Sequence, residues 1–116
     1  MRPELAKCLL DALGACRAIY EFTDGQTFDQ YKQDLLLRSA VERQFEILGE
    51  AFDRIDGLDA TFRNQLPEMG AIIGMRNRII HGYDAVDDSI IWDAVQRHVP
   101  RLTVWLESGE RKPSVA

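Results

Sequence analysis

The sequence is poor in the residues that build metal sites, with two cysteines and two histidines among 116 residues. Cys8 and Cys16 fall on one expected helix, where a rise of about 1.5 Å per residue places them roughly 12 Å apart. That separation excludes a disulfide between them and argues against a shared zinc site. Both fit the apolar face of the helix, so we expect two buried free thiols and, by default, a cytoplasmic protein. We expect neither a metal ion nor a cofactor.

Long apolar runs and an excess of positive charge are also absent. No stretch approaches the roughly 20 apolar residues that span a bilayer. Asp11 interrupts the apolar N-terminal segment, so we expect neither a membrane span nor a targeting segment. The net charge of −5 argues against a nonspecific coat on nucleic acid, although an RNA enzyme needs only a local positive patch. Arg76 and Arg78 could begin such a patch, and Arg97 and Arg101 could extend it.

Apolar residues recur at three- and four-residue spacings along most of the chain, and no segment alternates as a strand does. This pattern predicts an all-α fold, a bundle of four main helices with one or two short ones, in a single domain over residues 1–116. The tail from 110 to 116 is expected to fray. The main helices are expected near residues 3–22, 28–55, 67–82 and 89–108.

Several residues refine this prediction. Thr27 and Gln30 have capping-box spacing, and the segment from 28 to 55 could be one helix or a short helix followed by a longer one. Gly49 costs about 1 kcal/mol relative to alanine inside a helix, a cost that a tight helix–helix approach would justify. Pro100 is expected to kink or divide the last helix.

The two central helices carry the clearest apolar faces. The long helix has one apolar stripe, formed by Leu37, Val41, Phe45, Leu48, Phe52 and Ile55. Leu36 and other residues are expected to widen this stripe. The next main helix has five apolar residues: Met69, Ile72, Ile73, Ile79 and Ile80. Arg76 falls on this second face, so its charge must find a partner or line a cleft. The acids Glu42, Glu46 and Glu50 could pair with it, or Arg76 could clamp a phosphate.

The chemistry of the chain concentrates at the end of this helix. Arg76 suits phosphate, and His81 can transfer protons near neutral pH, which together are the minimum for cutting RNA without a metal. His81 could equally stabilise the helix C-terminus. Asn77 could orient the imidazole, bind a phosphate oxygen or remain a surface amide. Arg78 is a weaker candidate for substrate binding.

Two further side chains leave alternatives open. Tyr83 follows the glycine that stops the helix, and it could pack, bind substrate or accept a modifying group. His98 falls on the apolar stripe of the last main helix, where a packed histidine is expected rather than a ligand. A glycine-rich phosphate loop and a nucleophile elbow are both missing from the sequence.

The spacing of Arg76, His81 and Tyr83 resembles the RX4HXY motif of HepT-like toxins, which belong to the HEPN superfamily. Four residues separate the arginine from the histidine, and one separates the histidine from the tyrosine. Asn77 matches the polar residue that commonly follows the arginine in HEPN nucleases. The segment from Arg43 to Ala51 resembles the long-helix segment of the family around an IGEA pattern, with Leu48 before the glycine. The resemblance covers nearly the whole chain.

The resemblance implies an all-α homodimer whose motifs face each other in an interfacial cleft. It also implies a metal-independent endoribonuclease acting on RNA such as tRNA or mRNA, with Arg76, Asn77 and His81 as its site. The implied partner is a minimal nucleotidyltransferase antitoxin that transfers AMP to Tyr83. The expected product of cleavage is a 2′,3′-cyclic phosphate. The alternative from another class is a noncatalytic helical module that binds a nucleotide or a protein.

Overall fold

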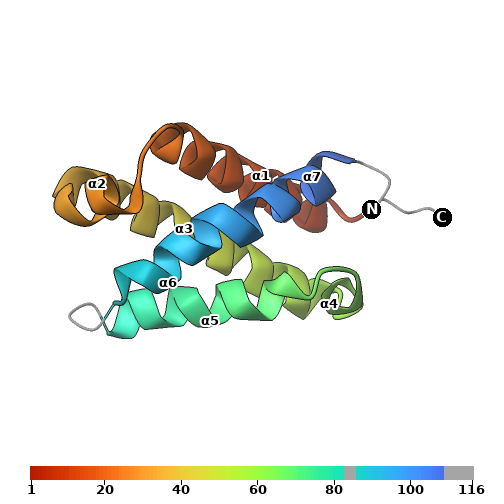
Figure 1. Ribbon diagram of the computed structural model, residues 1–116. Helices are drawn as coiled ribbons and strands as arrows, with labels where there is room; N and C mark the ends of the chain where they lie inside the picture. Colours follow the sequence, from red (N-terminus) through yellow and green to blue (C-terminus); the bar gives the residue numbers. More distant parts are fainter. Residues whose placement is uncertain (83–85, 109–116) are drawn as a thin grey trace.

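The computed structural model describes residues 1–82 and 86–108, and within these ranges the chain is helical throughout apart from short connections (Figure 1). The elements are α1 (Pro3–Thr23), α2 (Phe28–Gln33), α3 (Leu35–Leu58), α4 (Phe62–Gln65), α5 (Glu68–His81), α6 (Asp88–Asp93), a π-helical segment η1 (Ala94–His98) and α7 (Val99–Ser108). Counting α6, η1 and α7 as one continuous rod gives four main helices, with α2 and α4 as the two short ones. The predicted all-α bundle is confirmed. The expected frayed tail lies outside the described residues.

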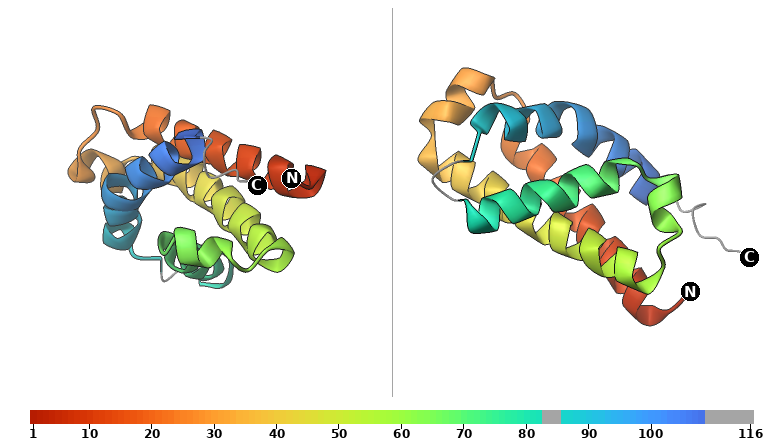
Figure 2. Two further views of the ribbon diagram at one scale, coloured as in Figure 1. Left: turned by 90° about the vertical axis from the view of Figure 1, so that its right-hand side faces the viewer. Right: turned by 90° about the horizontal axis from the view of Figure 1, so that it is seen from below.

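Helix α3 is the centre of the bundle. It lies between α1 and α5, while α7 packs against α1 (Figure 1, Figure 2). All six residues of its predicted stripe are buried, from Leu37 to Ile55. The prediction for Leu36 is wrong, because its side chain is 81% exposed. One residue corresponds to about 100° around a helix, so Leu36 points away from the side on which Leu37 is buried.

Side-chain caps set the boundaries around α2. The predicted capping box is present: the Gln30 amide donates to Thr27 Oγ1 (3.1 Å), and the Thr27 amide donates to Gln30 Oε1 (2.8 Å). Asp34 then separates α2 from α3, and its Oδ1 accepts from the Leu37 amide at 3.0 Å. The segment is therefore a short helix followed by a longer one.

Gly49 lies at a close approach of α3 and α5. A Cβ atom built at this position would lie 2.8 Å from Arg76 Cγ and 3.3 Å from the Ile72 carbonyl oxygen. It would lie even closer to Arg76 Cβ. No side chain fits there without displacing α5. The close approach predicted from the glycine is confirmed, and it brings α3 directly against the arginine of the motif.

The last main helix changes its winding just before Pro100. Through η1 the backbone is π-helical, and the Val99 amide donates to the Ala94 carbonyl, five residues back. Proline has no N–H, and its ring clashes with the carbonyl four residues earlier in an α-helix. The π-helical segment ends at His98 and α7 carries Pro100 in its first turn, so the helix changes its winding near Pro100 without being interrupted.

The two thiols are buried where α1 meets the core. Cys8 and Cys16 are both free, and Cys16 is fully buried. Burial raises the pKa of the Cys16 thiol to about 12, so the group is protonated and unreactive at neutral pH. The prediction of core thiols is confirmed. Among the described residues, no helix is both long enough and apolar enough to span a membrane.

Candidate active site

Arg76 is anchored by α3 from stem to head. Its stem lies against Gly49, and its Nη2 donates to Glu50 Oε1. Asp53 Oδ2 lies 3.7 Å from the same nitrogen, and only 15% of the arginine side chain is exposed. Of the three acids that the sequence suggested as partners of Arg76, Glu50 is the one that forms the ion pair. Asp53 is a second acid near Arg76 that the sequence did not suggest.

Asn77 holds the other end of the guanidinium. Its Oδ1 accepts from Arg76 Nη1 at 2.6 Å, so within one chain the amide orients the arginine. Arg76 Nε is buried and has no hydrogen-bond partner among the described residues. Each terminal nitrogen carries two N–H groups and uses one, to Asn77 or to Glu50. Within the described residues, one N–H on each terminal nitrogen makes no hydrogen bond, although Asp53 Oδ2 lies 3.7 Å from Nη2. A two-point phosphate contact needs two such groups.

Glu50 is shared between two arginines. Its Oε2 accepts from Arg54 Nε at 3.0 Å while Oε1 accepts from Arg76. The hydrogen bond from Arg54 and then the one from Arg76 lower the pKa of the Glu50 carboxyl. The group is therefore ionised at neutral pH, and half of its side chain is exposed.

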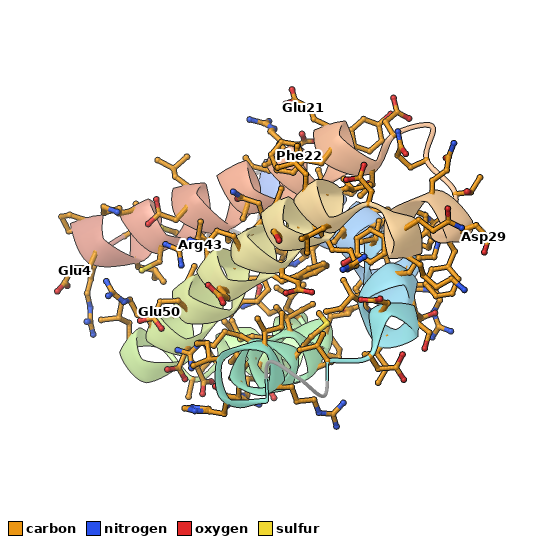
Figure 3. All side chains as sticks on the ribbon, turned by 90° about the vertical axis from the view of Figure 1, so that its left-hand side faces the viewer. Glu4, Glu21, Phe22, Asp29, Arg43 and Glu50 are labelled. Atoms are coloured by element: carbon orange, nitrogen blue, oxygen red, sulfur yellow. The ribbon has the colours of Figure 1, made fainter. Side chains whose placement is uncertain are left out.

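Arg76 and Glu50 open onto a cleft of about 290 Å³ between α1, α3 and α5. Figure 3 labels Arg43 and Glu50, which both project from α3. The cleft is lined by Cys8, Asp11, Arg43, Glu46, Ile47, Glu50, Ala51, Arg54, Arg76 and Ile80. Three arginines face three carboxylates, so the cleft of a single chain is electrically balanced.

Ile80 corrects the predicted apolar face of α5. It was expected in the core, but its side chain is 47% exposed and lines the cleft. Met75 is buried on α5 in addition to the predicted Met69, Ile72 and Ile79. The reason is tertiary, since among the described residues α5 packs mainly on α3 and turns Ile80 beyond that contact.

His81 ends α5 and is exposed. The Gly82 amide closes the helix by donating to the Arg78 carbonyl at 2.8 Å. No hydrogen bond joins the imidazole to Arg76, to Asn77 or to any other residue of the described ranges. Tyr83 lies outside the described residues.

Arg78, Arg97 and Arg101, the other cations that the sequence suggested, do not extend a positive patch from Arg76. Arg78 is exposed and lines two other hollows, between α5 and the α6–η1 segment. Arg97 lies 3.6 Å from Asp93, and Arg101 lies 3.5 Å from Glu68, so both are offset by acids.

His98 is half-buried and lines one of the two hollows that Arg78 also lines. Its Nδ1 is buried without a hydrogen-bond partner in the described part of the chain. This agrees with the packed histidine expected from the sequence. No group of three or more potential metal ligands forms among residues 1–82 and 86–108.

Residues 12–108 match the family model described as Ribonuclease HepT-like. The chain belongs to the HepT-like ribonuclease family. This match confirms the resemblance inferred from the RX4HXY motif and from the long-helix segment. It covers every helix except the start of α1, and it includes both Arg76 and His81.

Several proteins of similar sequence carry ribonuclease names, in agreement with the HepT-like family. "Putative RNase MJ0127" of Methanocaldococcus jannaschii is 34% identical over 94 residues, which is 79% of this chain and 75% of that protein. "Probable ribonuclease HepT" of Thermococcus cleftensis is 33% identical over 96 residues, 81% of this chain and 84% of its own. "Putative RNase TTE0752" of Caldanaerobacter subterraneus is 33% identical over 92 residues, 78% and 80% of the two chains. No solved structure matches the chain.

Sequence reasoning missed the arginines that surround the cleft. Arg43 and Arg54 pair with Glu46 and Glu50 at spacings of three and four residues on α3. Such spacings place opposite charges on one helical face, and this signal could have located the cleft. Asp53 had no comparable signal, because its contact with Arg76 depends on how closely α5 approaches α3.

Proposed function

We propose that this protein is a metal-independent endoribonuclease and the toxin of a toxin–antitoxin pair. The observation that supports this most is the state of Arg76. Its guanidinium is held on two sides, and two of its terminal N–H groups make no hydrogen bond among the described residues and could bind a phosphate. An exposed histidine, His81, follows five residues later on the same helix. Membership of the HepT-like ribonuclease family gives this arrangement its expected substrate, RNA.

In the proposed reaction His81 moves protons. As a general base it takes the proton of the 2′-hydroxyl, and as a general acid it gives one to the leaving 5′-oxygen, a contribution of about 10²–10⁴ in rate. Arg76 stabilises the charge that builds on the phosphorus oxygens in the transition state. Asn77 holds Arg76, and Arg78 adds a weaker phosphate contact. The product is a 2′,3′-cyclic phosphate, with no step that needs a metal.

The proposed active form is a homodimer. Taking a proton and giving one are done best by two histidines, and within the described residues of one chain the single motif histidine makes no hydrogen bond to Arg76. The cleft face suits self-association, because its balanced charges lie in pairs on α3 and Ile80 stands exposed among them. A two-fold axis can match such a face to itself, arginine against carboxylate.

The proposed regulator is a minimal nucleotidyltransferase antitoxin. In this proposal it transfers AMP to Tyr83, which adds bulk and negative charge beside the motif and repels RNA. Tyr83→Phe is expected to leave RNA cleavage intact and make it insensitive to the transferase with ATP. If the transferase with ATP silences Tyr83→Phe as it silences the wild type, modification of Tyr83 is not the mechanism.

A binding module without catalysis is the second candidate. The Arg76–Glu50 pair favours it, because a paired arginine needs no substrate to explain it. Arg76→Ala does not separate the two candidates, since removing a largely buried, paired arginine lowers stability under either one. His81→Ala does separate them, because the exposed histidine can be removed with little effect on folding.

The decisive experiment compares wild type with His81→Ala on total RNA and tRNA in EDTA, with folding checked by circular dichroism. Cleavage by the wild type alone supports the nuclease and assigns His81 to its site. If neither protein cuts, the weight moves to the binding module. Equal cutting by both indicates a contaminant or a site elsewhere in the chain.

A further inference from the structure

Glu50 has a geometry that neither a simple surface ion pair nor the motif explains. It lies next to Gly49, the residue that lets the Arg76 stem rest directly on α3. One residue later its carboxylate receives the head of the same arginine. Two consecutive residues of α3 therefore fix both the position and the direction of Arg76.

The guanidinium is fixed from two directions, since Asn77 holds Nη1 at 2.6 Å and Glu50 holds Nη2. Nε faces the protein interior without a partner. Rotation about the last side-chain bonds would break one or both of these contacts. The two remaining N–H groups consequently point in a defined direction, as a preorganised anion contact requires.

Arg54 completes the arrangement on the opposite oxygen of Glu50. Its Nε lies 3.0 Å from Oε2, so the carboxylate bridges two arginines and cannot swing freely. Arg54 also offsets the negative charge that would otherwise face an incoming phosphate. Asp53, at 3.7 Å from Arg76, is too far to replace the hydrogen bond from Glu50.

We propose that Glu50 is a positioning residue for Arg76, holding the guanidinium in the direction in which it meets the RNA phosphate, with Arg54 holding Glu50 in turn. This inference rests on the proposed ribonuclease function. Glu50 touches no reacting atom, so its effect is carried entirely by the orientation of Arg76.

The test uses Glu50→Ala and Glu50→Gln, with Glu107→Ala as the matched control. Glu107 is exposed to nearly the same extent as Glu50 and also pairs with an arginine, Arg17, at 3.0 Å, but it lies on α7 away from the cleft. Glu50→Ala is expected to lower kcat for RNA cleavage about 10- to 100-fold, as small misplacements of catalytic groups do, while KM changes much less. Glu50→Gln keeps an acceptor oxygen and should recover part of the loss. Glu107→Ala should stay near wild type.

A second measurement does not depend on RNA cleavage. Nitrogen-15 NMR of the Arg76 guanidinium should show faster rotation of its terminal NH₂ groups in Glu50→Ala than in Glu107→Ala. Equal rotation in the two variants overturns the proposal, whatever the activity. Unchanged or increased kcat in Glu50→Ala also overturns it, the increase indicating that Glu50 competes with phosphate. If wild type cuts no RNA, the ribonuclease function fails while the NMR result still decides the role of Glu50.

Discussion

At the scale of single residues, two glycines in neighbouring helices have opposite meanings. Gly49 faces the stem of Arg76 at a distance that no Cβ tolerates, whereas a Cβ at Gly74 would meet nothing within 4 Å. Both are helical, and neither has a positive φ. The first glycine is required by packing between α3 and α5, while the described structure supplies no packing reason for the second.

This contrast predicts opposite effects of the same substitution. Gly49→Ala should lower the free energy of unfolding by about 1–3 kcal/mol, the usual cost of overpacking a tight contact. Gly74→Ala should raise it by up to about 1 kcal/mol, because alanine favours the helix. Urea denaturation of both variants measures the two effects. A Gly49→Ala protein as stable as wild type would mean that α5 does not approach α3 as described.

The ion pairs of Glu50 with Arg54 and Arg76 have a defined pH dependence. Because the hydrogen bonds from Arg54 and then from Arg76 lower the pKa of Glu50 in the folded state, these pairs stabilise the fold above the ordinary carboxyl pKa of about 4.3. That contribution is lost as the pH falls through the lower folded pKa. Because Glu50 is half exposed, the contribution is at most about 1 kcal/mol.

We therefore expect wild type to exceed Glu50→Gln in stability by a constant margin from about pH 5 to 8, and by less as the pH falls below about 4. Urea titrations at several pH values give this difference directly. If the stability difference between wild type and Glu50→Gln grew on acidification, it would contradict the lowered pKa of Glu50 and the ion pairs that lower it.

At the scale of elements, the sequence predicted the helices well where one helix buries one face. The stripe of α3 followed from spacing alone, and so did the capping box at Thr27. Prediction failed for Leu36 and Ile80, because burial at the margin of a stripe depends on which neighbouring helix reaches it. The sequence left the split at Asp34 as one of two alternatives. Pro100 indicated a disturbance of the last helix without specifying π winding.

The division between α2 and α3 gives a prediction for Asp34. Its carboxylate accepts from the Leu37 amide, so Asp34→Ala should lower the free energy of unfolding by about 1 kcal/mol. Asp34→Asn keeps an N-cap acceptor and should lower it far less. Urea denaturation compares the two. Equal losses would show that charge, and not the cap, is what matters at this position.

At the scale of the whole molecule, the described residues of one chain join only part of the motif by hydrogen bonds. Arg76 and Asn77 lie together with Glu50, while His81 is exposed at the end of α5 and makes no hydrogen bond to them. Five residues of an ideal helix rotate by about 140°, so the spacing alone indicates that Arg76 and His81 do not share a face. The sequence could not choose Glu50 from the three candidate acids, because that choice depends on how α5 packs against α3.

The proposed dimer predicts that His81→Ala subunits suppress wild-type subunits. If both histidines of a dimer are needed, a tenfold excess of His81→Ala should lower the activity of each wild-type subunit about tenfold after exchange, by random pairing. The same excess of Arg97→Ala, an exposed change away from the motif, should not. Cleavage rates of exchanged mixtures measure this. Full wild-type activity in the His81→Ala mixture would show that one histidine suffices or that no dimer acts.

The central claim is that RNA is cut by transfer from its own 2′-hydroxyl, with His81 moving the proton. Its most direct test is the cleavage rate, in EDTA, of two oligonucleotides that differ only by a single 2′-deoxy group at the mapped cut site. The account predicts that the ribonucleotide is cut to a 2′,3′-cyclic phosphate and that the deoxy substitution abolishes cleavage there. Equal cutting of both oligonucleotides would contradict it, because the nucleophile would then be water and not the sugar hydroxyl.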